Sequence, residues 1–286
     1  MKRYSLPDLE NIATHIRQDI ITMLVRAGSG HSAGPLGMAD VFTALYFSVL
    51  KYDPRRPLWP DRDRLVLSCG HIAPVLYATL AHAGFYAKKE LRTLRQLGSP
   101  LQGHPHVGEL PGVENSGGPL GQGLSQAVGM ALAGVMDKKS YQVYCVMSDG
   151  EHQEGQTWEA ILFAGKHKLA QLTALVDRNN IQIDGFVEDV MPLEPLRKKY
   201  EAFNWHVLEV DGHNIQQVIE ACQTARAITE KPVVILCHTV PGRGVDFMEY
   251  KFEWHGKPPS KREATVALEE IRRVRTLDGK IVSEHE

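Results

Sequence analysis

The stretch Ser148-Asp149-Gly150-Glu151 follows the apolar run 141–147, and Asp177-Arg178-Asn179-Asn180 follows a second apolar run at 172–176. Apolar runs that stop at turn residues are typical of buried parallel strands. The intervening residues 154–169 have the apolar spacing of a helix. This pattern predicts one strand–helix–strand unit, whose right-handed crossover places both strands in one sheet. Asp149 and Asn179 would then project from its carboxyl edge, where open α/β sheets bind ligands.

The residue types at this edge suit a hard cation beside a phosphate. Asp149 offers a carboxylate and Asn179 a carboxamide, and Mg²⁺ is usually bound by one or two carboxylates together with phosphate oxygens and water. Gly150 allows the backbone to approach a phosphate closely. The helix that begins near Glu154 offers free N–H groups to an anion. The simpler alternative is that Asp149 only caps the following helix.

The rest of the chain alternates between predicted helices and strands. Strands are predicted at 64–68, 141–147, 172–176, 205–210 and 232–238. Helices are predicted at 8–27, 38–50, 74–83, 88–96, 124–136, 154–169, 195–203, 214–228 and 261–275. This alternation predicts an α/β fold, a doubly wound and mainly parallel sheet with helices on both faces, in a single domain spanning 1–286. The long glycine-rich loops 98–123 and 241–259 are expected to be functional.

Composition excludes several classes of protein. The formal net charge of −2 over 286 residues gives no electrostatic case for binding nucleic acid. No apolar run approaches 18 residues, so no membrane span is expected. The chain opens without the apolar segment of a signal peptide, and its four cysteines show no Cys-x-x-Cys spacing. Reduced, buried thiols and a cytoplasmic location are therefore expected.

Four histidines adjoin glycines in predicted loops: His31, His71, His104 and His255. Loops carry function on α/β scaffolds, and histidine can bind a phosphate, hold a sugar hydroxyl or transfer a proton. Two alternatives remain open from the residues alone. Each histidine could be a solvated loop residue, or several could bind zinc, although none has a ligand spacing such as His-Glu-x-x-His.

These motifs together resemble the transketolase family. Asp149-Gly150, then the 28 residues 151–178, then Asn179-Asn180 is similar to the thiamine diphosphate motif, which usually begins with Gly where this chain has Ser148. The loop at 30–40 resembles the first transketolase loop, Gly-His-Pro-Gly, with Ser32-Ala33 at the departing positions. Further similar segments follow in the family's order, at 68–71, 103–105, 118–123, 177–185 and 254–256.

The resemblance implies a role for each matching residue. The residues expected to hold Mg²⁺ or Ca²⁺ are Asp149, Asn179 and the carbonyl of Ile181. Those expected to contact thiamine diphosphate are His71, Gly118, Pro119, Leu120, Gly150, Glu151, Asn179 and His255. Those expected to face substrate hydroxyls and assist proton transfer are His31, His104 and His255. Glu154 is expected at a subunit contact, relaying to the partner's cofactor glutamate; its simpler role is a charge at a helix start.

The resemblance covers only the amino-terminal domain of a transketolase. It therefore implies the N-terminal subunit of a split enzyme, active only with a C-terminal, pyrimidine-binding partner, most simply as an α2β2 heterotetramer. Such an enzyme transfers a two-carbon ketol group from a ketose to an aldose, either of them free or phosphorylated. Two alternatives remain. The chain could be the diphosphate-binding subunit of another thiamine enzyme, a sugar synthase or an oxo-acid dehydrogenase α subunit, or a non-catalytic binding protein of the same fold.

Overall fold

A parallel sheet forms the centre of the computed structural model, which describes residues 4–273. Its strand order is β1-β2-β3-β7-β6, and every neighbouring pair is parallel. The strands are β1 (Arg64–Leu67), β2 (Val143–Ser148), β3 (Leu172–Arg178), β6 (His206–Asp211) and β7 (Val233–His238). The five predicted strands and the predicted α/β class are confirmed.

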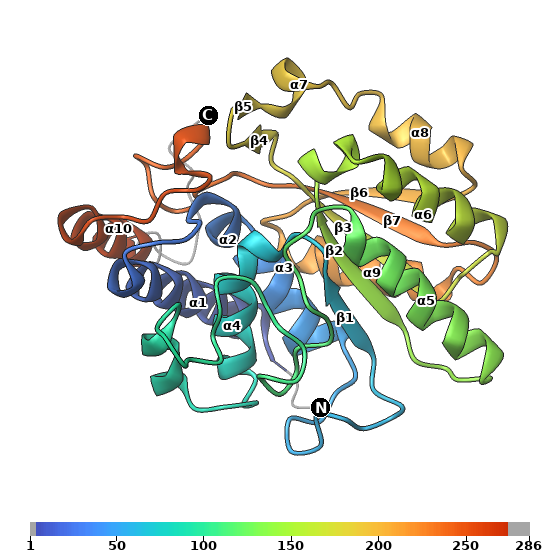
Figure 1. Ribbon diagram of the computed structural model, residues 1–286, viewed down its shortest axis with the longest axis horizontal. Helices are drawn as coiled ribbons and strands as arrows, with labels where there is room; N and C mark the ends of the chain where they lie inside the picture. The colour runs from blue at the N-terminus through green and yellow to red at the C-terminus, as the bar shows by residue number, and fades with distance from the viewer. Residues whose placement is uncertain (1–3, 274–286) are drawn as a thin grey trace.

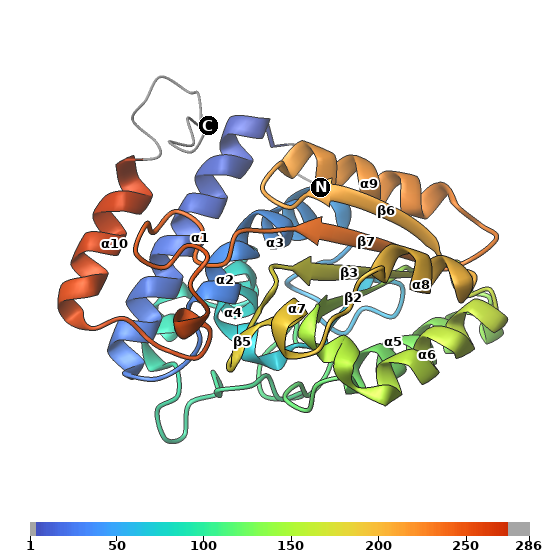
Figure 2. The ribbon, with the colours of Figure 1, turned by 90° about the horizontal axis from the view of Figure 1, so that it is seen from above.

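Helices cover both faces of the sheet (Figures 1 and 2). One face carries α1 (Leu6–Ala27), α3 (Ala39–Ala44), α4 (Ala73–His82) and α9 (Ile215–Ala227); the other carries α5 (Gln122–Met136), α6 (Gly155–Lys166) and α8 (Leu196–Ala202). Side chains alternate along β2, so Tyr144 and Val146 join the first core while Cys145 and Met147 join the second. Strands buried on both faces explain the continuous apolar runs in the sequence.

Several local predictions need correction. The predicted loop before residue 38 contains the short helix α2 (Ala33–Gly37), and the predicted helix 38–50 is α3 followed by a π-helical turn at Leu45–Val49. The predicted helix 88–96 is a 3₁₀ helix, Lys88–Thr93. A small hairpin, β4 (Ile181–Gln182) with β5 (Gly185–Phe186), and helix α7 (Val187–Val190) were not predicted, because elements this short have no periodicity. The last helix, α10, covers Lys261–Arg273, and the rest of its predicted extent lies outside the described residues.

The register of the strands places the motif residues at one edge. Ser148 at the end of β2 pairs with Asp177 on β3, and Arg178 pairs with His238 at the end of β7. Glycine-rich loops gather at this carboxyl edge. All four cysteines are buried and unpaired, as predicted. Within residues 4–273, no helix combines the length and apolarity needed to cross a bilayer.

Candidate active site

The carboxylate of Asp149 lies against the turn formed by residues 179–181. The Asn180 N–H donates to Asp149 Oδ2 at 2.7 Å, and the Ile181 N–H donates to Asn179 Oδ1 at 3.0 Å. The structure thus brings the carboxylate of Asp149 together with the turn that carries the Asn179 carboxamide and the Ile181 carbonyl. One carboxylate with neutral oxygen donors fits Mg²⁺ or Ca²⁺ when phosphate supplies further ligands.

Arg178 is a member of this site that the sequence analysis did not identify. Its guanidinium donates to Asp149 Oδ2 at 2.9 Å, and to carboxylates of Glu188 at 2.6 Å and Glu194 at 3.1 Å. Burial raises the pKa of Asp149, while the charge of Arg178 acts in the opposite direction. Arg178 could not be identified from the motif alone, because its acidic partners Glu188 and Glu194 lie 10 and 16 residues further along the chain. Arg178 therefore holds the carboxylate of Asp149 in a charge-assisted hydrogen bond.

Asp177 orients the amide of Asn179. Asn179 Nδ2 donates to Asp177 Oδ2 at 2.8 Å, and the Thr239 hydroxyl donates to the other oxygen of the same carboxyl group. Asp177 is completely buried, and this burial raises its pKa to about 8. Because the amide nitrogen is engaged by Asp177, the side-chain oxygen of Asn179 is directed away from it, toward the turn.

Three of the predicted histidines form one cluster. The ring centroids of His31 and His71 are 5.2 Å apart, those of His31 and His255 5.5 Å, and those of His71 and His255 4.9 Å. Burial lowers the pKa of His31 and His255 to about 4, and lowers that of His71 well below its usual value. The rings are therefore neutral near pH 7.

The cluster has unused hydrogen-bonding capacity. The Nδ1 atoms of His31 and His255 are buried and have no hydrogen-bond partner among the described residues. Buried polar atoms of this kind call for a ligand or an ordered water, so the histidines fit an anionic cofactor and a polyhydroxyl substrate. The zinc alternative gains no support, since no group of three or more His, Cys, Asp or Glu in residues 4–273 could hold a metal ion.

Close backbone contacts bring the other predicted residues to this cluster. A Cβ on Gly70 would lie 2.5 Å from the Gly118 nitrogen, and a Cβ on Gly118 would lie 3.6 Å from the His104 ring. Gly118 is thereby fixed between His104 and the turn that carries His71. Pro119 and Leu120, which follow it, are exposed. A Cβ on Gly34 would be 4.0 Å from His71 Nε2 and 3.9 Å from Asp177 Oδ2, so Gly34 separates the histidines from the end of β3.

The side chain of Glu151 joins neighbouring segments of the chain, and its predicted contact with the cofactor stays a prediction. That side chain is 0% exposed, and its two carboxylate oxygens accept from Ser68 Oγ, from the Gly121 N–H at 3.2 Å and from the Ser148 N–H at 2.9 Å. Burial raises the pKa of Glu151 to about 7. The carboxylate is thus occupied in joining three loops, which leaves only its backbone for a cofactor contact.

Glu154 precedes α6 and has an exposed side chain. Its side chain makes no capping hydrogen bond to that helix, and its position at the start of α6 is compatible with the simpler role of a charge there. Its predicted place at a subunit contact stays a prediction. Ser148 ends β2 in extended backbone, so the chain accepts a serine where the motif usually has glycine.

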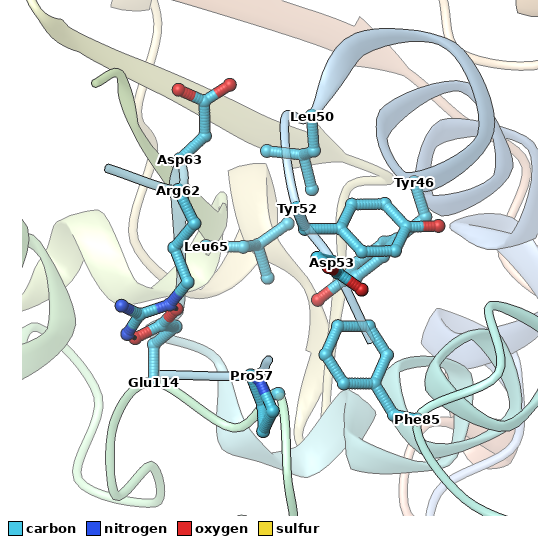
Figure 3. A pocket seen from close by; sticks show the side chains of 11 residues that line it. Tyr46, Leu50, Tyr52, Asp53, Pro57, Arg62, Asp63, Leu65, Phe85 and Glu114 are labelled. Atoms are coloured by element: carbon cyan, nitrogen blue, oxygen red, sulfur yellow. Dashed lines mark hydrogen bonds and ion pairs between the residues drawn. The ribbon is translucent and has the colours of Figure 1, made fainter. Parts of the chain in front are cut away.

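A small pocket lies at the opposite edge of the sheet, next to Leu65 near the start of β1 (Figure 3). The rings of Tyr52 and Phe85 stack beside it, and the ion pair of Arg62 with Glu114 faces it. Its volume is about 20 Å³, which is room for about one water. The size of this pocket excludes a cofactor.

A model of the family described as "Transketolase, thiamine diphosphate binding domain" matches residues 9–275. The chain belongs to the transketolase family. Among similar proteins, the 6-deoxy-6-sulfo-D-fructose transketolase subunit of a Clostridium species is 42% identical over 93% of this chain and 97% of its own length. One of the subunits of the apulose-4-phosphate transketolase of Phocaeicola vulgatus is 40% identical over 89% of this chain and 90% of its own length.

Solved transketolases share the fold. The enzyme of Leishmania mexicana matches with a TM-score of 0.88 and 32% identity, and that of Campylobacter jejuni with a TM-score of 0.88 and 33% identity. The match covers 95% and 98% of this chain but only 42% and 45% of those two chains. The predicted family and the predicted class of fold are confirmed.

Ser32, which departs from the family's loop, gives a first prediction. Its side chain is fully buried, and its hydroxyl donates to the Lys257 carbonyl at 2.6 Å, so it ties the loop of His31 to the loop of His255. We expect Ser32→Ala to lower the free energy of unfolding by about 1–2 kcal/mol, as measured by urea denaturation. Thr265→Ala removes a hydroxyl bond on an exposed helix surface and is the matched control. Equal effects of the two substitutions would contradict a special role for Ser32.

The burial of His255 predicts a pH-dependent stability. Because burial lowers the pKa of His255 from 6.5 to about 4, the unfolded chain binds its proton at a higher pH than the folded chain. Stability is therefore lost as the pH falls from 6.5 toward 4, by up to about 3 kcal/mol. His255→Gln cannot be protonated, so the stability of the variant relative to wild type should rise over this window. A difference that stays constant between pH 7.5 and 4 would contradict the prediction.

Proposed function

We propose that this chain is the thiamine-diphosphate-binding subunit of a two-polypeptide transketolase. The observation that supports this most strongly is the meeting of Asp149 with the 179–181 turn at the same sheet edge as three neutral histidines. Asp149 and the 179–181 turn suit a metal-bound diphosphate, and the three histidines suit a sugar. The two relatives named above as parts of transketolases align over 97% and 90% of their own lengths.

The predicted roles then divide the site into a metal part, a diphosphate part and a sugar part, and Asn179 and His255 each serve two of them. Asp149, Asn179 and the Ile181 carbonyl hold Mg²⁺ or Ca²⁺. The diphosphate is contacted by Gly150, Asn179, His71, His255 and the segment 118–120. Bound thiamine diphosphate supplies the chemistry that breaks and forms the carbon–carbon bond. The protein's part is to bind, orient and exclude water.

The histidines act on the sugar. His31, His104 and His255 bind hydroxyl groups and exchange protons with them, which a neutral imidazole can do because it carries one donor and one acceptor nitrogen. The names of the two relatives specify a sulfo-sugar and a sugar phosphate. The substrate class we propose here is therefore a ketose and an aldose with an anionic end group.

A pyrimidine-binding partner completes the proposed enzyme, most simply in an α2β2 assembly in which Glu154 lies at a subunit contact. An obligate interface of this kind buries more than roughly 2,000 Å². The free, buried cysteines support a reducing, cytoplasmic location.

Reconstitution tests this function. The chain is purified alone and co-purified with the product of a candidate partner gene, and both samples receive thiamine diphosphate and Mg²⁺. We expect ketol transfer from xylulose 5-phosphate to ribose 5-phosphate by the complex only. Transfer by the chain alone would contradict the two-polypeptide assignment. A complex that binds the cofactor but transfers no ketol group, with phosphorylated or free sugars, would contradict transketolase activity.

A further inference from the structure

The imidazole of His152 holds the two peptide groups on either side of Asp149. Its Nδ1 atom lies 3.1 Å from the Ser148 carbonyl oxygen and 3.0 Å from the Asp149 carbonyl oxygen. Since a carbonyl oxygen only accepts, Nδ1 carries the proton and shares it between the two oxygens. Each peptide group is planar, so fixing both carbonyls fixes the two backbone dihedrals of Asp149, at φ −65° and ψ −45°. The direction of the Asp149 side chain is thereby fixed as well.

Tyr200 orients the His152 ring from its other side. The Tyr200 hydroxyl lies 2.7 Å from His152 Nε2, which carries no proton in this tautomer and therefore accepts. Both side chains are buried, and Tyr200 belongs to α8 in the second core. The ring of Trp158 packs against that of His152 with the centroids 5.8 Å apart. With Nε2 bonded to Tyr200, the ring presents Nδ1 to the end of β2.

The carboxylate of Asp149 depends on this main-chain geometry for its place. Its Oδ1 accepts from the Gly150 N–H and its Oδ2 from the Asn180 N–H, both at 2.7 Å. The second of these bonds joins Asp149 to the turn that carries the other two proposed metal ligands, Asn179 and the Ile181 carbonyl. A rotation of either peptide group beside Asp149 would turn its carboxylate away from that turn.

We propose that His152 is a positioning residue for the metal site. Its ring, oriented by Tyr200, fixes the main chain of Asp149, so that the carboxylate is in place before a cation binds. Residues that orient a metal ligand in this way raise the affinity for the metal, because the ligand loses less freedom on binding. The inference rests on the proposed function, since it takes Asp149 as the metal ligand.

Calorimetry of the reconstituted complex tests this role without turnover, with Mg²⁺ titrated in the presence of thiamine diphosphate. His152→Leu keeps a side chain in the core but offers no donor, and we expect the Kd for Mg²⁺ to rise about tenfold to hundredfold. His152→Asn places its amide nitrogen where Nδ1 lies, because both atoms are bonded to Cγ, and should recover most of the affinity. Tyr200→Phe leaves the ring without its second anchor and should give a smaller rise in Kd.

Trp158→Phe is the matched control. It removes one hydrogen bond to the same turn, at the His152 carbonyl, and leaves the two carbonyls beside Asp149 in their bonds to His152. We expect this variant to be less stable in urea but to bind Mg²⁺ like wild type. Equal rises in Kd for His152→Leu and Trp158→Phe would show that His152 only stabilises the turn, and the proposal would fail. Unchanged affinity in His152→Leu, or affinity in His152→Asn as weak as in His152→Leu, would overturn it as well.

A wild-type complex that binds no Mg²⁺ would refute the proposed function, and hydrogen exchange would then decide on His152. In the metal-free complex, the bond to Asp149 Oδ2 protects the Asn180 N–H. Its exchange, followed by mass spectrometry of the peptide that contains Asn180, should be about twofold to tenfold faster in His152→Leu and unchanged in Trp158→Phe. Equal exchange in wild type and His152→Leu would overturn the proposal.

Discussion

Asp149→Ala is expected to abolish ketol transfer by the reconstituted enzyme, lowering kcat by about a thousandfold or more. The loss of residues that merely orient a metal ligand costs about 10–100-fold, and Asp149 supplies the single carboxylate among the proposed ligands. Without this carboxylate, the cation would lose one of its protein ligands, and the diphosphate that the cation binds would be held less tightly. Calorimetry with thiamine diphosphate and Mg²⁺ measures the same loss without turnover, and cofactor affinity should fall at least about tenfold.

The fold should survive this substitution. Arg178 keeps its bonds to Glu188 and Glu194 when Asp149 is removed, so its charge stays paired. The N–H groups of Gly150 and Asn180 lose their acceptor, which lowers the stability without changing the fold. The circular dichroism spectrum is expected to match that of wild type. Asp189→Ala, which removes an exposed carboxylate nearby, is the matched control and should retain full affinity. Wild-type cofactor affinity in Asp149→Ala would exclude Asp149 from the metal site.

Glu151→Ala is expected to destabilise the protein by about 3–5 kcal/mol. The substitution leaves the Ser68 hydroxyl and the N–H groups of Gly121 and Ser148 without their acceptor in a site that is 0% exposed at Glu151. Each unsatisfied buried donor costs about 1–3 kcal/mol. The free energy of unfolding, obtained from urea denaturation of the chain, measures the effect.

Two variants define how Glu151 acts. Glu151→Gln keeps one acceptor oxygen but directs an NH₂ group at one of the donors, so we expect about half the loss seen with alanine. Glu159→Ala removes an exposed carboxylate from α6 and should change the stability by less than about 0.5 kcal/mol. If Glu151→Ala were as stable as Glu159→Ala, the carboxylate would not be what joins the three loops.

The order of the strands along the sheet could not be predicted in full from the sequence. The runs before Asp149 and Asp177 predicted that β2 and β3 lie parallel in one sheet, since a single helix connects them, and the structure shows that they are neighbours. The position of β7 between β3 and β6 had no counterpart in any local pattern. Strand order depends on which apolar faces pack together, and β2, β3 and β7 are alike in being buried on both faces.

The strands, most helices and the motifs that carry Asp149, Asn179 and the four loop histidines could be predicted from the sequence, because apolar periodicity and turn residues are local. The contacts of these residues depend on the tertiary structure. Glu151 meets Ser68 across 83 positions, and Ser32 meets Lys257 across 225. Arg178, unremarkable in the sequence, bonds to Asp149, 29 positions away. Contacts between distant segments form when the loops meet at the sheet edge. No periodic pattern of residues in the sequence indicates which loops will meet there.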